Sequence, residues 1–382
     1  MESLIETGVL QGLAAAALTW LLMKAMHPYA RRLNLLDFPK GRKDHAHPTA
    51  ITGGLAMAVA FVVVLVSARH NYAMASLVSF VSASVLLVGV GLYDDRNDLR
   101  WYWRILAQVI ASLIMIYGAG VRVEQLGAVF GMDDLALGWL SVPFTVFATI
   151  GIINAINMID GADGLAGLLV AACLVMLAAA ALYAGNTSLS RLGLTISGAV
   201  AAFLVYNMRF PWQPRAKAFM GNAGSAFLGL VVAWVVFRLT QNASHPVNPV
   251  LALWLIPVPV MDCLVLTVRR SREGRSPFSA GRDHIHHFMQ DGGFGPTQAA
   301  LLLAAFSVAC GLAAGQAMRF DVPHPVILAT FLLLCVGWYW VSADRLRALA
   351  FFAVLRRLPV FGTAPQRPQS RPGVDTVETD GA

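Results

Sequence analysis

Four strongly polar residues recur at steps of three inside an otherwise apolar part of the chain. They are Asn154, Asn157, Asp160 and Asp163, in the stretch NAINMIDGADGLAG. In a regular helix such steps rotate by about 60° each, so the glycines of the stretch would have to loosen the backbone before the four groups could converge. Carboxylate and amide oxygens suit Mg²⁺, which usually takes one or two carboxylates together with phosphate oxygens. The stretch therefore predicts a Mg²⁺–phosphate site, with a glycine-rich capping turn between two helices as the alternative.

The stretch GLYDDRNDLRWYWRILAQ places a second acidic group at the end of an apolar run. Asp94 and Asp95 are adjacent, and a helix would put Asp98 on the same face as Asp94. Carboxylates crowded at an apolar boundary repel one another and favour a divalent cation or a shared proton. The alternative is a solvated loop in which one Asp caps the following helix.

Basic side chains gather in the stretch RRSREGRSPFSAGRDHIHHFM, which holds five Arg and three His within 19 residues. Arginine binds phosphate through paired hydrogen bonds, and histidine can donate to it. A zinc site is the alternative for the histidines, but no Cys or acidic residue with zinc-ligand spacing accompanies them. Asp262 precedes this stretch within an apolar run, where an ionisable group is a functional candidate.

Two further stretches could contact a substrate. In AKAFMGNAGSAFLG, glycines and a serine begin an apolar run, which is typical of a helix N-terminus open to anions, and Phe219 could stack on a base. Small residues at helix starts are also common in membrane proteins, which is the alternative. The basic stretch RRLNLLDFPKGRKDHAHPTAITGG, with Lys43 and His45, could bind either substrate or anionic lipid headgroups.

The elements that must position these groups are membrane spans. The 382-residue chain is 57% hydrophobic and only 13% charged, whereas roughly 25% of the residues of a soluble domain are charged. Apolar runs of about 17–20 residues recur throughout, and each is long enough to cross a hydrocarbon core of about 30 Å. We therefore predict an all-α, polytopic integral membrane protein with about 11 transmembrane helices. The predicted spans are 5–26, 51–68, 74–93, 104–119, 136–156, 165–184, 193–208, 223–239, 248–268, 298–317 and 325–341.

The distribution of Lys and Arg predicts how these spans are oriented. With the N-terminus outside and the C-terminus in the cytoplasm, only five of the 28 basic residues face outward. Orientation in the membrane then explains the formal net charge of +7, so no nucleic-acid partner is expected. Under this topology every stretch described above falls in or beside one of five inner loops. The loops cover 27–50, 94–103, 157–164, 209–222 and 269–297.

The chain is predicted to form one transmembrane unit, residues 1–345, followed by a cytoplasmic tail, residues 346–382. The first apolar run follows MESLIETG, which lacks basic residues, so a retained span is expected rather than a cleaved signal peptide. The stretch LRALAFFAVLRRLPVF could lie flat on the inner leaflet as an amphipathic helix. The remainder of the tail is polar and rich in proline, and is predicted to be disordered.

Acids and amides for a metal therefore meet Arg and His for phosphates at one face of the membrane. This combination favours phosphoryl transfer between a cytosolic nucleotide-linked donor and a lipid-linked acceptor. A membrane transporter is the alternative from another class, but a transporter would place its ionisable groups near the middle of the membrane.

Five stretches resemble one known family closely, the polyprenyl-phosphate N-acetylhexosamine-1-phosphate transferases. The stretches are DDRNDL, NAINMIDGADGLAG, FMGNAGSAFLG, PVPVMD and SPFSAGRDHIHH. They occur in the family's order within residues 30–290. The HIHH form is more similar to the undecaprenyl-phosphate N-acetylglucosamine branch than to the muramoyl-pentapeptide branch.

The resemblance implies transfer of N-acetylhexosamine 1-phosphate, with N-acetylglucosamine as the expected sugar, from a UDP-sugar to undecaprenyl phosphate, with release of UMP. It implies Mg²⁺, or alternatively Mn²⁺, and a bacterial cytoplasmic membrane with the active site facing the cytoplasm. The product would start a cell-surface polysaccharide such as an O-antigen. Membrane lipid is an expected partner, and a homodimer is an open alternative.

The family's motifs, carried over onto this chain, give its residues expected roles. Asp94 and Asp95 would hold or deprotonate the lipid phosphate, and Phe219 would stack on uracil. The expected catalytic residues are Asp94, Asp95, Asp160 and Asp163. The expected metal ligands are Asn157, Asp160, Asp163 and Asn222. The expected substrate contacts are Lys43, His45, Asp98, Arg104, Asn154, Phe219, Arg282, His284, His286 and His287.

The chain departs from the family's pattern at three positions. Asn222 stands where the family usually has an Asp that resembles a Mg²⁺ ligand, and an uncharged oxygen there should lower metal affinity. Gly281 replaces an Asp before the Arg of the histidine motif, and Ala50 replaces a Pro before a glycine pair. A catalytically impaired relative, which binds lipid or nucleotide without turnover, is therefore a second alternative.

Overall fold

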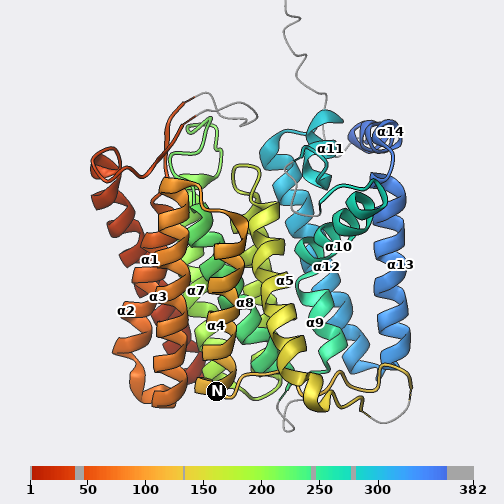
Figure 1. Cartoon of the computed structure of the whole chain (residues 1–382), viewed down its shortest axis with the longest axis horizontal. Coiled ribbons are helices and arrows are strands. Elements are labelled where there is room, and N and C mark those ends of the chain that lie inside the picture. Colours follow the sequence, from red (N-terminus) through yellow and green to blue (C-terminus); the bar gives the residue numbers. More distant parts are fainter. Residues whose placement is uncertain (1, 39–46, 132–133, 242–246, 277–280, 359–382) are drawn as a thin grey trace, which may run out of the picture.

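The computed structural model describes residues 2–38, 47–131, 134–241, 247–276 and 281–358 of the chain. Within these ranges the protein is a bundle of α-helices with one small antiparallel sheet, which confirms the all-α prediction (Figure 1). The helices are α1 (Glu2–Met26), α2 (Gly53–Ser67), α3 (Met74–Asn97), α4 (Trp101–Ala119), α5 (Ser141–Ile159), α6 (Leu165–Tyr183), α7 (Thr187–Asn207), α8 (Gly221–Thr240), α9 (Pro249–Leu255), α10 (Pro257–Arg272), α11 (Ile285–Asp291), α12 (Pro296–Arg319), α13 (His324–Ser342) and α14 (Arg345–Arg356). The short elements are the 3-10 helices η1 (His27–Tyr29), η2 (Arg69–Asn71) and η3 (Gly138–Leu140) and the strands β1 (Leu36–Asp37) and β2 (Thr49–Ala50).

Nine helices of the described ranges are long and apolar enough to cross a membrane. Together with the shorter apolar helix α2 and the bent pair α9–α10, they coincide with the predicted spans. The structure therefore supports a multi-pass membrane protein. The number of crossings and the orientation stay predictions.

The predicted span at 248–268 is wrong as a single straight helix. α9 ends at Leu255, α10 begins at Pro257, and the two helices are bent by 93°. Pro257 has no N–H to continue the ladder of α9, and Ile256 before it adopts a non-helical backbone with φ −129° and ψ 46°. The bend turns α10 toward α11, where the two helices share polar contacts described below.

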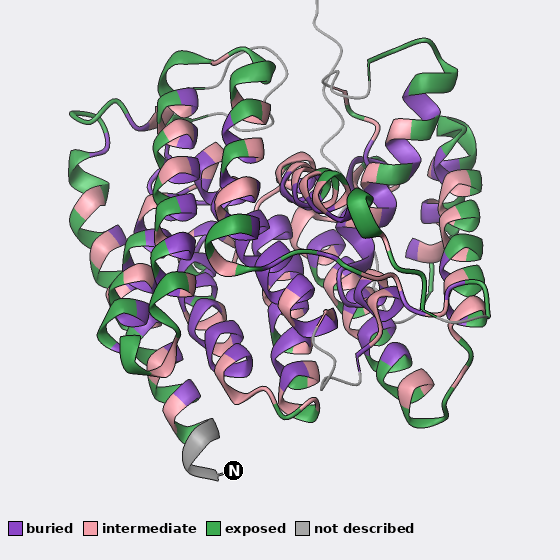
Figure 2. Ribbon diagram, turned by 60° about the horizontal axis from the view of Figure 1, so that its bottom comes forward, coloured by how far each residue is buried: buried purple, intermediate pink, exposed green. Residues whose placement is uncertain are grey.

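α8 forms the buried centre of the bundle. It packs against α2, α3, α5 and α6, and nearly every residue after its first turn is buried. Figure 2 shows that buried residues gather in the middle of the bundle. A helix that is apolar on all sides can occupy such a central place or face lipid. In contrast, α13 exposes Leu332, Leu333 and Val336, as expected for a helix that faces lipid.

The ends that carry the polar stretches lie at the top of the bundle in Figure 1. α3, α5 and α7 end there, and α8 begins there. Two glycines allow close approaches at this end: a Cβ on Gly221 would lie 2.5 Å from Asp95 Oδ2, and one on Gly161 would lie 2.8 Å from His286 Nε2. The end of α3 therefore lies against α8, and the α5–α6 turn lies against α11.

Candidate active site

Asp95 joins the end of α3 to the start of α8. Its carboxylate accepts hydrogen bonds from the backbone N–H groups of Asn222, at 2.8 Å, and Ala223, at 3.3 Å. A carboxylate at a helix N-terminus satisfies free amides and interacts favourably with the helix dipole. Gly221, with φ +69°, makes the approach possible because a side chain there would collide with Asp95.

Asp94 lies in the same turn of α3 but faces α4. It is buried and accepts hydrogen bonds from the backbone N–H of Leu99, at 2.7 Å, and from Arg104 Nη1, at 3.5 Å. Asp98 does not continue the helix: it caps α3 in the left-handed region, with φ 50°, and its side chain is exposed. Of the predicted acidic group, Asp94 and Asp95 therefore face inward and Asp98 faces solvent.

Asn157 and Asn222, two of the predicted metal ligands, contact each other. Asn157 Nδ2 donates to Asn222 Oδ1 and to Ser225 Oγ, both at 2.9 Å. Asn154, one turn earlier on α5, donates from Nδ2 to Gln108 Oε1 of α4 at 2.8 Å. A small cavity lies between α3, α4, α5 and α8. Its polar lining consists of Gln108, Asn154, Asn157, Asn222 and Arg104.

The two carboxylates of the α5–α6 turn have different surroundings. Asp160 caps the end of α5, and burial, followed by the carboxylates of Asp95 and Asp163, raises the pKa of Asp160 to about 7. Asp163 instead forms an ion pair with Arg209 Nε at 2.6 Å and accepts the backbone N–H of Ala216 at 3.2 Å. Asp163 therefore holds the α7–α8 loop, while Asp160 stays within electrostatic reach of Asp95.

The three histidines surround the start of α11. The ring centroids of His286 and His287 are 4.1 Å apart, and those of His284 and His286 are 5.5 Å apart. His286 is fully buried, and neither of its ring nitrogens has a hydrogen-bond partner within the described ranges. Burial, followed by His287, His284 and Arg282, lowers the pKa of His286 well below its usual value. A neutral imidazole of this kind offers one donor and one acceptor.

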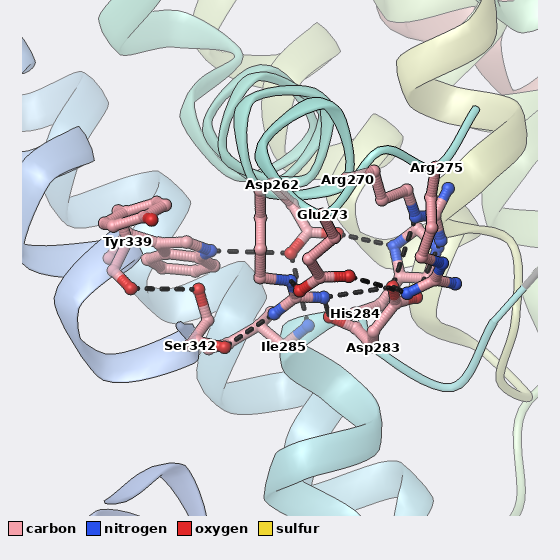
Figure 3. A network of polar contacts seen from close by, with 11 residues as sticks. Asp262, Arg270, Glu273, Arg275, Asp283, His284, Ile285, Tyr339 and Ser342 are labelled. Atoms are coloured by element: carbon pink, nitrogen blue, oxygen red, sulfur yellow. Dashed lines mark hydrogen bonds and ion pairs between the residues drawn. The ribbon is translucent and has the colours of Figure 1, made fainter. Parts of the chain in front are cut away.

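Asp262 positions His284 rather than standing alone inside a span (Figure 3). Its Oδ2 lies 2.7 Å from His284 Nδ1, and its Oδ1 accepts the backbone N–H of Ile285 at 3.2 Å. Trp338 of α13 donates from Nε1 to the same Oδ1 at 3.4 Å. The bend before α10 brings Asp262 to this place, which a straight span would not.

Asp283 neutralises the arginines at the end of α10 (Figure 3). Arg270 binds it through two bonds, Nη2–Oδ1 at 2.6 Å and Nε–Oδ2 at 3.1 Å, and Arg269 Nη2 lies 3.1 Å from Oδ2. Burial opposes ionisation of Asp283, but Arg270 and Arg269 outweigh it and lower its pKa to about 2. These two arginines are therefore occupied within the fold, whereas Arg282 is exposed and pairs with Asp291 at 3.5 Å.

The remaining predicted contacts are only partly placed. Phe219 is half-buried beside the start of α8, where its backbone bonds link it to Ala50 and Gly53. Lys43 and His45 lie outside the described residues. A Cβ on Gly281 would meet Asp283 Oδ1 at 2.6 Å, so the side chain that the family usually carries there would crowd this carboxylate.

Three contributors were not predicted. Gln108 receives the Asn154 amide, Arg209 holds Asp163, and Asn207 bridges the Gly164 N–H and the Ala218 carbonyl at 2.8 and 2.9 Å. Gln108 and Asn207 are single polar residues in apolar runs, a signal that marks candidates in membrane helices. Arg209 has no comparable local signal.

The described residues supply only part of a metal shell. No group of three or more His, Cys, Asp or Glu side chains among them is arranged to hold a metal ion. The oxygen donors at hand are the Asp160 carboxylate and the Asn157 and Asn222 amides. A partial oxygen set is usual for Mg²⁺, which keeps waters and binds substrate phosphates.

Comparisons with known proteins agree with the motifs. Residues 75–240 match the model of glycosyl transferase family 4. An undecaprenyl-phosphate alpha-N-acetylglucosaminyl 1-phosphate transferase of Yersinia pestis is 34% identical over 332 residues, which cover 86% of this chain and 89% of the relative. Proteins of the same name from Salmonella typhi and Haemophilus influenzae are 33% and 34% identical over 80% and 76% of this chain, and over 82% and 81% of their own lengths. The chain therefore belongs to the polyprenyl-phosphate sugar-1-phosphate transferases of glycosyl transferase family 4, as its five motifs predict.

Proposed function

We propose that this protein transfers N-acetylglucosamine 1-phosphate from UDP-N-acetylglucosamine to undecaprenyl phosphate, releasing UMP, at the cytoplasmic side of a bacterial inner membrane. The names of the relatives supply the sugar and the acceptor. The observation that carries the proposal is the meeting of Asp95 with the Asn157–Asn222 pair at one end of the bundle, beside Asp94 and its partner Arg104. Arg104, Asn157 and Asn222 line one cavity between α3, α4, α5 and α8.

In the proposed reaction, an oxygen of the lipid phosphate attacks the sugar-linked phosphorus of the donor. The bond from that phosphorus to the oxygen that bridges to UMP breaks, and UMP leaves with the negative charge. Arg104 lies 3.5 Å from Asp94 and lines the same cavity as Asn157, so it can neutralise the incoming lipid phosphate. Asp94 and Asp95 would accept the remaining proton of that phosphate.

The oxygen donors described above fit Mg²⁺, with Mn²⁺ as the alternative. Asp160 and the amide oxygens of Asn157 and Asn222 would hold the ion. Asn157 donates through its Nδ2, which leaves its Oδ1 for this purpose. When bound, the ion would supply neutralisation of the donor's diphosphate.

His286 of α11 is a candidate hydrogen-bond donor to the diphosphate of the UDP-sugar. Its ring nitrogens lack partners within the described ranges, and Nε2 lies against Gly161 in the α5–α6 turn. A buried polar atom without a partner costs free energy unless a ligand or water satisfies it. The cost favours a water or a phosphate oxygen as the partner of His286.

The two alternatives differ in their support. Asn222 favours an impaired relative because an amide oxygen lacks the charge of the Asp that the family usually has. A transporter is disfavoured, because the described acidic groups of the site gather at one end of the bundle and Asp262 is bound to His284 there.

The proposal is tested by UMP release from purified protein in detergent, with UDP-N-acetylglucosamine, undecaprenyl phosphate and a Mg²⁺ titration. Wild type is compared with Asn222→Asp. Lipid-dependent UMP release by the wild type is expected, and Asn222→Asp should need a lower Mg²⁺ concentration for half-maximal rate because it restores a charged ligand. Release by Asn222→Asp alone would support the impaired relative. Silence of both proteins with a panel of UDP-sugars would reject the transferase.

A further inference from the structure

α14 has two apolar faces, and only one of them is covered by the described protein. Ala348 and Phe352 point inward and are buried. The opposite face carries three large apolar side chains, Leu346, Phe351 and Val354, which are 77%, 44% and 63% exposed. Leu358, two residues after the end of the helix, is 47% exposed.

The inner face of α14 clamps the segment that carries the histidines. Phe352 packs on Gly292, immediately after α11, and meets the Phe294 ring edge to face at a centroid distance of 6.4 Å. Arg345 binds Asp291 at 2.7 Å, and Arg356 Nε donates to the Gly293 carbonyl at 3.4 Å. The C-terminal end of α11 is thus fixed by α14, while Asp262 fixes its N-terminal end.

The outer face of α14 continues the lipid-facing surface of α13. α14 lies across the end of α13 and is seen end-on in Figure 1. Arg347 Nη1 donates to the Trp340 carbonyl at 2.8 Å, and its guanidinium stacks 4.7 Å from the centroid of the exposed Trp340 ring. Val336, one turn before Trp340, is also exposed. At this corner Arg347 therefore joins α14 to the exposed apolar surface of α13.

The charges beside this face identify the occupant. Arg345 and Arg347 are exposed on α14, and Arg357 is exposed directly after its last residue. Helices that combine an exposed apolar face with arginine lie in the headgroup region and are attracted to anionic lipids. Trp340 at the end of α13 is a residue typical of this interface.

We propose that α14 is seated in an anionic leaflet through Leu346, Phe351, Val354 and Leu358, and that this seating presses α11 into the active site. Anionic lipid would then act as a structural activator of the histidine segment. The link to catalysis rests on the function proposed above, whereas the lipid contact and the clamp on α11 do not.

The lipid contact is tested by fluorescence quenching in vesicles. Ala350, on the outer face of α14, is changed to Cys and labelled in a background where Cys263 and Cys335 are Ala. Bromine-labelled acyl chains should quench the probe several-fold more than a probe at Arg215→Cys in the exposed α7–α8 loop. The quenching should increase when phosphatidylglycerol replaces phosphatidylcholine. Equal quenching at the two sites would overturn the proposal.

Removal of residues 359–382 tests whether lipid or the C-terminal tail covers the outer face of α14. The quenching at position 350 should be unchanged in the shortened protein. Quenching that appears only after removal would show that the tail, rather than lipid, covers this face.

The clamp is tested by hydrogen exchange of the peptides that contain residues 285–291. Leu346→Ser with Val354→Ser should raise their exchange several-fold in phosphatidylglycerol vesicles, to the level of wild type in phosphatidylcholine. The control is Leu332→Ser with Val336→Ser on the lipid face of α13, which should leave α11 protected. Unchanged exchange in the α14 variant would reject the clamp, whatever the result of the UMP assay. If the wild type releases UMP, the KM for UDP-N-acetylglucosamine should rise under the same conditions that raise hydrogen exchange in α11, namely the α14 variant and phosphatidylcholine vesicles.

Discussion

Asp283 is the residue through which two buried arginines are neutralised. Arg269 and Arg270 are 6% and 1% exposed, and both contact its carboxylate. Fully buried cations are tolerated only when they are paired. The same carboxylate sits next to His284, so the pairing also fixes where the histidine segment begins.

Asp283→Asn should lower the free energy of unfolding by about 3–5 kcal/mol, because it leaves buried positive charge uncompensated. The measurement is thermal unfolding of the purified protein in detergent. The matched control is Glu124→Gln, which breaks the Arg122–Glu124 pair, where both side chains are about half exposed. That pair should be worth about 0–1 kcal/mol. Equal losses in the two variants would contradict the role assigned to Asp283.

The lowered pKa of Asp283 also predicts a pH dependence. Its folded-state pKa is about 2, below the ordinary 3.8, so its contribution to stability is present above pH 3.8 and is lost as the pH falls through about 2. The difference in melting temperature between wild type and Asp283→Asn should therefore be constant at higher pH. It should shrink as the pH falls from 3.8 towards 2. A difference that stays constant over this range would show that Arg269 and Arg270 do not lower the pKa of Asp283.

At the scale of elements, the site depends on the α5–α6 turn, which is fixed by contacts with residues outside the two helices it connects. The α5–α6 turn carries Asp160, and its place is set by the ion pair between Asp163 and Arg209 at the end of α7. Arg209 also accepts Thr297 Oγ1 on its carbonyl at 3.4 Å, which adds a contact from α12. The turn is thus tied to two helices beyond its own hairpin.

Arg209→Ala should raise the KM for UDP-N-acetylglucosamine several-fold and change the melting temperature little. Arg209 is partly exposed, so its pair contributes more to the position of Asp163 than to global stability. The measurement is the steady-state rate of UMP release over a donor titration. Arg215→Ala, in the same loop and exposed, is the control and should behave as wild type. An unchanged KM in Arg209→Ala would mean that the turn holds its position without this pair.

Local patterns predicted the elements better than the contacts between them. Apolar runs located the helices because each span must satisfy its backbone internally. The break between α9 and α10 was missed, although Pro257 and Pro259 signal it, because the run is apolar enough to be read as one span. α7 begins at Thr187 rather than 193, since Asn186 caps it through the Leu189 N–H.

The sequence indicated which residues belong to the site, but not which of them contact one another. Asn157 and Asn222 were both expected as metal ligands, Asn222 through the family resemblance, and the structure joins them by a hydrogen bond. The pairing of Asp163 with Arg209 and of Asp262 with His284 depends on how distant helices cross, which no local spacing encodes. Asp163 was expected at the metal, yet its carboxylate is bound by Arg209.

At the scale of the whole molecule, the bundle is chemically one-sided. The ends of α3, α5 and α7 and the start of α8 carry the acids and amides, and α11 adds the histidines at the same end (Figure 1). A lipid-linked acceptor and a water-soluble donor can meet only at such a boundary. The proposed reaction therefore requires this end to face the compartment that holds the UDP-sugar.

The orientation is predicted from the basic residues. Only five of 28 Lys and Arg are predicted on the side opposite the site, which predicts that the site end faces the cytoplasm. Arg215 in the α7–α8 loop and Arg122 after α4 are both exposed and belong to opposite ends of the bundle. Each can therefore be changed to Cys and tested with a membrane-impermeant thiol reagent in intact spheroplasts.

Arg122→Cys should be labelled in intact spheroplasts, and Arg215→Cys only after the membrane is opened. The four native cysteines lie within apolar helices, two of them buried, so the wild type supplies the blank. Arg122→Cys removes only an exposed ion pair, and Arg215 is exposed in its loop, so neither change should disturb the fold. The opposite labelling pattern would place the histidines and the Asn157–Asn222 pair outside the cell. No UDP-sugar would reach them there, so the labelling result decides whether the proposed donor can meet the site at all.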